Sequence, residues 1–224
     1  MAAESRRAAG LRELIEACAA ARVSFREVPR SDLDRIGADH QGVAARVVPP
    51  RPLSDGDLHR LAFAPDAVVV VLDGVTDPQN LGAAARSAEG AGVDLLVTRE
   101  RRSSPVTAAA VRASAGALLH LPLARVVNLT RTLRWLADEA VFTVVGLDEA
   151  APGSIHDQPC PPGRLALVVG SEGAGMSRLV RESCDLLVRL PMRGHVSSLN
   201  AAASLAAVLY GYVLPSRQAP PDPR

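Results

Sequence analysis

The 224-residue sequence contains no lysine and only three cysteines. The cysteines, at positions 18, 160 and 184, are odd in number and far apart, which argues against a disulfide framework or a cysteine-based metal site and favours a reducing cytoplasm. No apolar run approaches the ~20 residues that span a bilayer, so we expect no membrane helix. Glu13 and Glu16 interrupt the N-terminal segment, which argues against a signal peptide.

Because lysine is absent, all 25 residues counted as lysine or arginine are arginine. Two explanations fit: a GC-rich genome, or the suitability of the planar guanidinium group for phosphate and base contacts. The net charge of +1 does not distinguish them. Between Arg99 and Arg134, however, seven arginines face a single acid, Glu100, which gives a local balance of +6. This segment is therefore our candidate for phosphate contacts.

The composition, 48% hydrophobic and 22% charged, is typical of a soluble globular protein. Residues 1–50 form a small N-terminal region, in which we predict a helix, strands at 23–28 and 40–48, and a short helix capped by Ser31. A Pro- and Asp-rich linker is expected at 51–65 and a disordered, Pro-rich tail at 216–224.

Strands alternate with helices in the main domain, expected at 66–215. A continuous β-branched run at 67–75 predicts a strand buried on both faces. The same analysis predicts further strands at 93–98, 141–148, 165–170 and 185–191, and helices at 81–92, 104–116, 129–140, 177–184 and 198–214. This alternation predicts an α/β fold, a parallel sheet with helices on both faces.

Three strand-to-helix junctions carry unusual polar residues, and parallel sheets bind ligands beyond the carboxyl ends of their strands. In the first junction, Asn80 stands where a helix cap would stand and Arg86 follows on the helix. A capping asparagine and a solvated arginine remain the alternative. The small alanines at 83–85 favour a functional Arg86, because small neighbours let an arginine approach a ligand.

The second junction, LVVGSEGAGMS, is rich in glycine, which permits close backbone approach. Its GxxGxG spacing differs from the dinucleotide fingerprint, and Glu172 would repel a pyrophosphate but suits a positively charged ligand. A plain turn with a surface glutamate is the alternative. In the third junction, LPMRGHVSSLNAAAS, Ser197 or Ser198 is expected to cap the last helix, with Asn200 in its first turn. His195 is interpreted as a loop residue.

The segments NLGAAAR, VVGSEGAGMS and LPMRGHVSSLNAAASLA, in this order and each after a strand, resemble the three motifs of the SpoU (TrmH-like) RNA 2'-O-ribose methyltransferases of the SPOUT superfamily. The resemblance covers residues 66–213. It implies S-adenosylmethionine as methyl donor, no metal, a C-terminal deep trefoil knot, and a homodimer formed through the last helix. HQGVAARV resembles the subgroup that methylates guanosine in 23S ribosomal RNA, whose N-terminal domain is similar to ribosomal protein L30e; here that α+β domain is expected to be truncated.

The resemblance also implies roles for individual residues. Arg86 matches the arginine proposed to activate the ribose hydroxyl. The residues matched to positioning of the ribose and of Arg86 are Asn80, Glu172, Ser198 and Asn200. The residues implied to hold the cofactor are Gly146, Leu147, Gly170, Glu172, Gly173, Leu190, Met192, Ser198 and Leu199. The residues expected to contact RNA are Arg86, Arg101, Arg102 and Arg112.

Other functions remain open on the sequence alone. The target could be a tRNA ribose or a ribosomal site whose methylation blocks an antibiotic. DNA is excluded as a target, because it has no 2'-hydroxyl group. The chain could also be a non-catalytic RNA-binding dimer, against which the intact polar motif residues argue. A nucleotide-dependent oxidoreductase is disfavoured by the glycine spacing and by Glu172.

Overall fold

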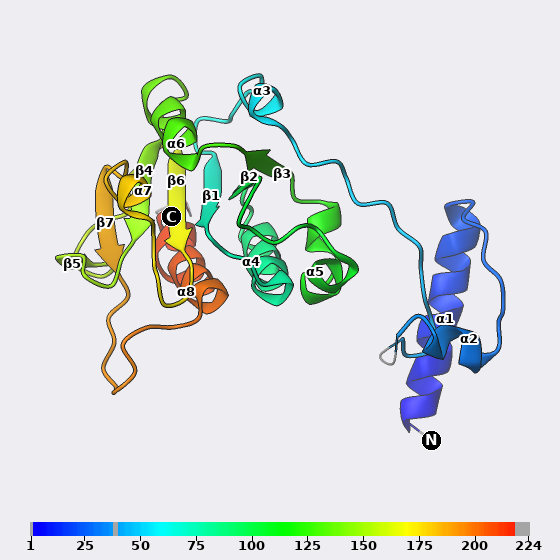
Figure 1. Cartoon of the computed structure of the whole chain (residues 1–224). Helices are drawn as coiled ribbons and strands as arrows, with labels where there is room; N and C mark the ends of the chain where they lie inside the picture. Colours follow the sequence, from blue (N-terminus) through cyan, green and yellow to red (C-terminus); the bar gives the residue numbers. More distant parts are fainter. Residues whose placement is uncertain (1, 38–39, 218–224) are drawn as a thin grey trace, which may run out of the picture. The chain divides into compact units, whose positions relative to one another are not determined.

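The computed structural model describes residues 2–37 and 40–217, and the chain divides into two compact units, Met1–Val48 and Pro49–Arg224 (Figure 1). The first unit contains helices α1 (Ala2–Ala20) and α2 (Arg30–Asp34). Helix α2 begins at Arg30 behind Pro29, so the predicted cap at Ser31 is wrong.

The two strands predicted for this unit do not form in its described residues. In the first of them, Val23 and Phe25 alternate as in a strand, but each is 56% exposed. An isolated strand is unstable in water because it has no partner for its backbone groups. The described part of the unit is therefore helical and irregular, not α+β.

The second unit is built on a seven-stranded, wholly parallel sheet with the strand order β3-β2-β1-β6-β4-β7-β5. The strands are β1 (Val68–Asp73), β2 (Leu95–Arg99), β3 (Leu123–Val126), β4 (Thr143–Leu147), β5 (Gly153–Ser154), β6 (Leu165–Gly170) and β7 (Leu186–Arg189). The five predicted strands are confirmed, and the two edge strands, β3 and β5, are not predicted by the sequence patterns.

Helices cover both faces of this sheet, as predicted. On β1, Val68, Val70 and Leu72 face one apolar layer, and Val69 and Val71 face the other. The first layer includes residues of α4 (Pro78–Gly90), α5 (Ala108–Ala113) and α8 (Ala201–Val208), and the second includes residues of α3 (Asp55–Leu58), α6 (Leu129–Asp138) and α7 (Arg178–Arg181). Within the described residues, no helix is long and apolar enough to cross a membrane.

Part of the segment expected as a linker, 51–65, is folded onto the sheet. The backbone N–H of Leu53 donates to the carbonyl of Leu123 at 2.8 Å, and Leu58 in α3 is fully buried. Helix α3 begins with a capping box formed by Ser54 and Asp57. Hydrogen bonds from Ser54 to the Asp57 carboxylate lower the pKa of Asp57 to about 2. A flexible linker would not bury such residues.

The predicted last helix, 198–214, is divided. Helix α8 continues into a π-helical turn, η2 (Leu209–Val213), and then into α9 (Leu214–Arg217). Ser216 and Arg217, expected in the disordered tail, belong to α9, and residues 218–224 lie outside the described residues.

Candidate active site

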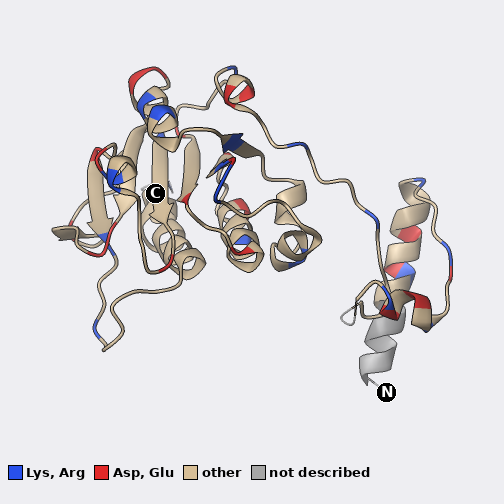
Figure 2. Ribbon diagram, in the orientation of Figure 1, with Lys and Arg blue, Asp and Glu red and all other residues tan. Residues whose placement is uncertain are grey.

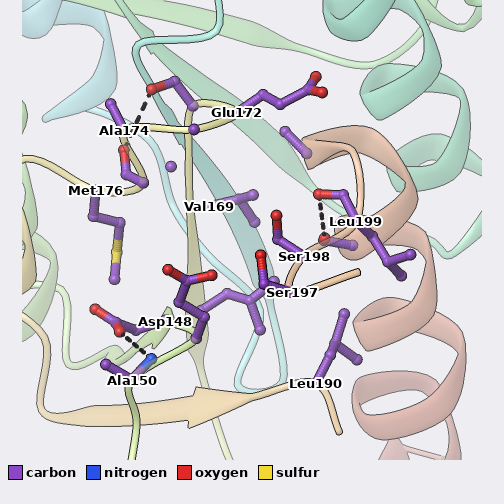
Figure 3. A pocket seen from close by; sticks show the side chains of 18 of the residues that line it. Asp148, Ala150, Val169, Glu172, Ala174, Met176, Leu190, Ser197, Ser198 and Leu199 are labelled. Atoms are coloured by element: carbon purple, nitrogen blue, oxygen red, sulfur yellow. Dashed lines mark hydrogen bonds between the residues drawn. The ribbon is translucent and has the colours of Figure 1, made fainter. Parts of the chain in front are cut away.

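The second and third predicted junctions and the loop after β4 line one cavity, at the carboxyl ends of β4, β6 and β7 (Figures 1 and 3). The cavity has a volume of about 420 Å³, within the range of small-molecule sites. In Figure 3, Met176 lies on one side, Leu190 and Leu199 lie on the other, and Val169 lies between them. The sheet topology thus brings together loops that are far apart in the sequence.

One side chain from each junction joins a polar cluster beside this cavity. The Nδ2 of Asn200 donates to Oδ1 of Asn80 at 2.8 Å and to Oε2 of Glu172 at 3.1 Å. These partners lie 120 and 28 residues away in the sequence. Convergence of two predicted polar residues on the amide group of a third is difficult to explain as three separate surface turns.

Asn200 also begins α8. Its Oδ1 accepts hydrogen bonds from the backbone N–H of Ala202 at 2.9 Å and of Ala203 at 3.3 Å. The prediction that Ser197 or Ser198 caps this helix is therefore wrong. Because the cap fixes Oδ1, it also aims Nδ2 at the other two junctions.

The first junction is organised by Asp77, not by Asn80. Asp77 Oδ1 accepts from the N–H of Gln79 at 3.0 Å, and Pro78 occupies the first helical position of α4. The predicted cap at Asn80 is wrong, because Asn80 lies in the first turn. Its side chain is thereby left to bond with Asn200.

Arg86 is exposed on α4 and does not line the cavity. The small residues around it serve helix packing: Ala84 and Ala85 are buried, and a Cβ on Gly82 would lie 2.5 Å from the carbonyl oxygen of Ala110 in α5. The alanines therefore do not clear space beside Arg86, contrary to the sequence argument. The exposed guanidinium group is accessible to a large substrate.

The glycine loop after β6 turns back on the end of its own strand. Ser171 and Gly175 exchange two backbone hydrogen bonds of 3.1 and 2.9 Å. A Cβ on Gly170 would lie 2.1 Å from the carbonyl carbon of Gly175, so no side chain fits there. Gly175, at φ +64°, adopts the left-handed conformation that glycine allows.

Eight of the nine residues expected to hold the cofactor line the cavity: Leu147, Gly170, Glu172, Gly173, Leu190, Met192, Ser198 and Leu199. Gly146 does not line the cavity, because it packs against side chains that follow α7 or belong to β7. A Cβ there would lie 2.8 Å from both Cys184 Sγ and Leu187 Cδ2. Burial raises the pKa of the Cys184 thiol to about 12, so it remains protonated at neutral pH.

The cavity wall also contains an ion pair that the sequence patterns do not predict. Asp148, directly after β4, binds Nε of Arg181 in α7 through one carboxylate oxygen and the N–H of Ala150 through the other at 2.8 Å. Asp148 could have been recognised from the sequence, because it stands at the carboxyl end of a predicted strand. Nothing in the sequence marks Arg181 as its partner, since Arg181 lies within a short helix.

The arginine-rich segment divides into structural and exposed residues, and Figure 2 shows arginines where β2 and β3 end. Arg99 forms an ion pair with Asp73, and Arg125 donates to the carbonyl of Glu100 at 2.6 Å. Three predicted RNA contacts, Arg101, Arg102 and Arg112, are exposed. No group of side chains in the described ranges is suited to hold a metal ion.

A parallel sheet whose carboxyl-end loops form a glycine-lined cavity with a polar cluster beside it is typical of α/β proteins that bind a small ligand. Residues 67–210 match the model of the SpoU rRNA Methylase family, and residues 1–53 match that of RNA 2'-O ribose methyltransferase substrate binding. The chain belongs to the SpoU rRNA methylase family.

Two relatives illustrate this membership. A Vibrio cholerae protein named 23S rRNA (guanosine-2'-O-)-methyltransferase RlmB is 45% identical over 193 residues, covering 84% of this chain and 76% of that protein. An uncharacterized tRNA/rRNA methyltransferase of Mycolicibacterium vanbaalenii is 45% identical over 203 residues, covering 89% and 64%. This chain thus spans about two-thirds to three-quarters of their lengths.

A solved structure gives the same family. The SpoU methyltransferase AviRb of Streptomyces viridochromogenes, in complex with the cofactor AdoMet, is 33% identical with a TM-score of 0.65. The match covers 72% of this chain and 64% of that one.

Proposed function

We propose that the chain transfers a methyl group from S-adenosylmethionine to a ribose 2'-hydroxyl in RNA, most specifically to a guanosine of 23S ribosomal RNA. The observation that carries this proposal is the Asn80–Glu172–Asn200 cluster beside a cavity of cofactor size. The Vibrio cholerae relative supports the choice of target, and the AdoMet complex of AviRb supports the choice of donor.

The cavity fits this donor. Gly170 packs directly against the backbone of residues 175–176. Because no side chain intervenes there, main-chain groups of the loop are available to bind the ligand. Apolar residues such as Leu190 and Leu199 suit an adenine ring, and the Glu172 carboxylate suits a positive centre. When bound, S-adenosylmethionine supplies an electrophilic methyl group.

The residues of the chain then position and activate the hydroxyl group. In-line placement supplies much of the acceleration, and the hydroxyl must also lose its proton. An arginine side chain is always charged in proteins, so Arg86 is a poor base. It acts instead by contacting the target phosphate or by polarising the hydroxyl, while Asn80, Glu172, Ser198 and Asn200 orient the ribose.

Within the second unit, the exposed Arg101, Arg102 and Arg112 supply phosphate contacts. The N-terminal unit has its own RNA-binding role, because its sequence matches the substrate-binding model. The proposal includes an RNA-binding role like that of an L30e-like domain for that unit, and a cytoplasmic homodimer formed through α8. It also includes a deep trefoil knot at the C-terminus. The knot is supported by the two loops, 170–176 and 190–199, that line one cavity.

The direct test measures methyl transfer from radiolabelled S-adenosylmethionine to 23S rRNA, 16S rRNA and tRNA transcripts. We expect label in 23S rRNA, resistant to alkaline cleavage at a single ribose. Label only in tRNA would keep the reaction and replace the target, as the tRNA/rRNA name of the mycobacterial relative allows. Absence of both label and cofactor binding would leave the non-catalytic RNA-binding alternative.

Replacing Asn200 with aspartate separates its two roles. Aspartate keeps the oxygen that caps α8 but loses the donor to Asn80 and places a second carboxylate beside Glu172. We expect methyl transfer to fall about 100-fold. The thermal midpoint should shift by no more than about 2 °C.

The control is Asn200→Ala, which loses the cap as well and should cost a further ~1 kcal/mol of stability. Wild-type turnover by the folded Asn200→Asp variant would show that the polar cluster has no part in the reaction.

A further inference from the structure

A second polar cluster lies outside the cavity lining, where three functional segments begin or end. Asp73 is the last residue of β1, Arg99 is the last residue of β2, and Ser177 directly precedes α7. Strand β1 lies between β2 and β6, so the sheet brings these three positions together. The roles proposed above use none of the three side chains.

Each of the three residues in this cluster contacts the other two. Asp73 is only 4% exposed; its Oδ1 lies 2.7 Å from Nη2 of Arg99, and its Oδ2 accepts the backbone N–H of Ser177 at 2.7 Å. The same Nη2 donates to Oγ of Ser177 at 3.0 Å. Ser177 occupies the cap position of α7, yet its side chain makes no cap hydrogen bond. Its hydroxyl and its N–H group are both bound by the ion pair.

Each member of the cluster adjoins a segment with a proposed role. The junction that carries Asn80 follows Asp73, the exposed arginines 101 and 102 follow Arg99, and the glycine loop 170–176 ends at Ser177. A further hydrogen bond, from the N–H of Ser104 to the carbonyl of Val75 at 2.9 Å, fixes the first two segments to each other. The ion pair thus joins both of them to the end of the glycine loop.

We propose that Asp73 and Arg99 are positioning residues that hold Ser177, and with it the glycine loop, in the conformation that forms the cavity. Neither residue lines the cavity, so they act through the loop and not on the ligand. A buried charge that loses its partner is strongly unfavourable, so each member keeps the others in place. The identity of the ligand rests on the function proposed above.

The test compares Asp73→Asn, Ser177→Ala and Arg99→Lys with the matched control Arg178→Gln. Arg178 lies next to Ser177 but forms only an exposed pair with Glu182. Binding of S-adenosylmethionine and of RNA is measured separately by calorimetry, well below the thermal midpoint of each variant. A role confined to sheet stability would lower that midpoint without changing the affinity of the folded protein.

Asp73→Asn can satisfy only one of the two partners, so we expect cofactor affinity to fall about tenfold, the worth of one charge-assisted hydrogen bond. Ser177→Ala removes only the hydroxyl link and should cost about threefold. Arg99→Lys keeps the charge and should remain within about threefold of wild type, while Arg178→Gln should match it. RNA affinity should stay at the wild-type value in all four.

Amide hydrogen exchange of the 170–178 peptide in the ligand-free protein provides a readout that does not depend on the ligand. Exchange should accelerate in Asp73→Asn and not in Arg178→Gln, because the one amide oxygen cannot accept from both Arg99 and the Ser177 N–H. Unchanged exchange together with unchanged cofactor affinity would overturn the proposal. If the wild-type chain binds no S-adenosylmethionine, the proposed function fails, and the exchange result still decides whether the cluster holds the loop.

Discussion

Replacing Arg86 with alanine should lower methyl transfer about 1000-fold, a loss typical of removing a group that acts on the reacting proton. Binding of S-adenosylmethionine should not change, because Arg86 lies on the exposed side of α4 and does not line the cavity. Single-turnover kinetics with saturating cofactor and RNA measure the chemical step. Calorimetry measures cofactor binding in the same preparation.

Two further variants sharpen this result. Arg86→Lys keeps a positive charge but loses the planar fork, so it should recover part of the rate if the arginine contacts a phosphate and little if it polarises the hydroxyl. Arg178→Ala, an exposed helical arginine outside the proposed site, should have wild-type turnover. An Arg86→Ala protein with turnover within threefold of wild type would remove Arg86 from the mechanism.

The position of the site could be predicted because one rule of sheet architecture decides it. Each of the three junctions follows a strand, and the carboxyl ends of parallel strands share one edge. The sequence therefore predicts that Asn80, Glu172 and Asn200 lie together, and they are joined by hydrogen bonds. Strongly apolar strands such as β1 and β6 were equally predictable, because burial on both faces leaves a continuous β-branched pattern.

Helix caps could not be predicted where several suitable residues compete. By residue type, either Asp77 or Asn80 could cap α4. The cap is Asp77, because Pro78 directly after it suits the first helical position. In the same way, Ser197 and Ser198 are as good caps as Asn200 by residue type. Only the turn geometry shows that Asn200 both caps the helix and joins the cluster.

Long-range pairs and short edge elements were also beyond sequence patterns. Asp73 and Ser177 are 104 residues apart, and nothing in their local sequence marks them as partners. β3 has Arg125 in its middle, so its apolar alternation is too short to recognise. The prediction of two N-terminal strands is wrong for the opposite reason. Their alternating pattern is present, but the described residues provide no partner strand.

The Gly170→Ala variant should lose cofactor binding altogether, by at least about 100-fold, and should also be less stable. The added Cβ would lie 2.1 Å from the carbonyl carbon of Gly175 and 2.2 Å from the backbone nitrogen of Met176. Neither is a flexible side chain, so the glycine loop itself must move away from β6. Since that loop carries Glu172 and lines the cavity, the cavity and the polar cluster change together.

Overpacking of this kind costs ~1–3 kcal/mol, which corresponds to a fall of about 2–12 °C in the thermal midpoint of a domain of this size. Gly194→Ala is the matched control, because no atom lies within 4 Å of its added Cβ; its affinity and midpoint should stay at the wild-type values. Gly173→Ala separates strain from collision, since its φ of +80° disfavours alanine while the space around it is open. It should lose ~1–2 kcal/mol of stability and retain measurable cofactor binding. If Gly170→Ala bound S-adenosylmethionine as well as Gly194→Ala does, the glycine loop could not be the wall that shapes the cofactor site.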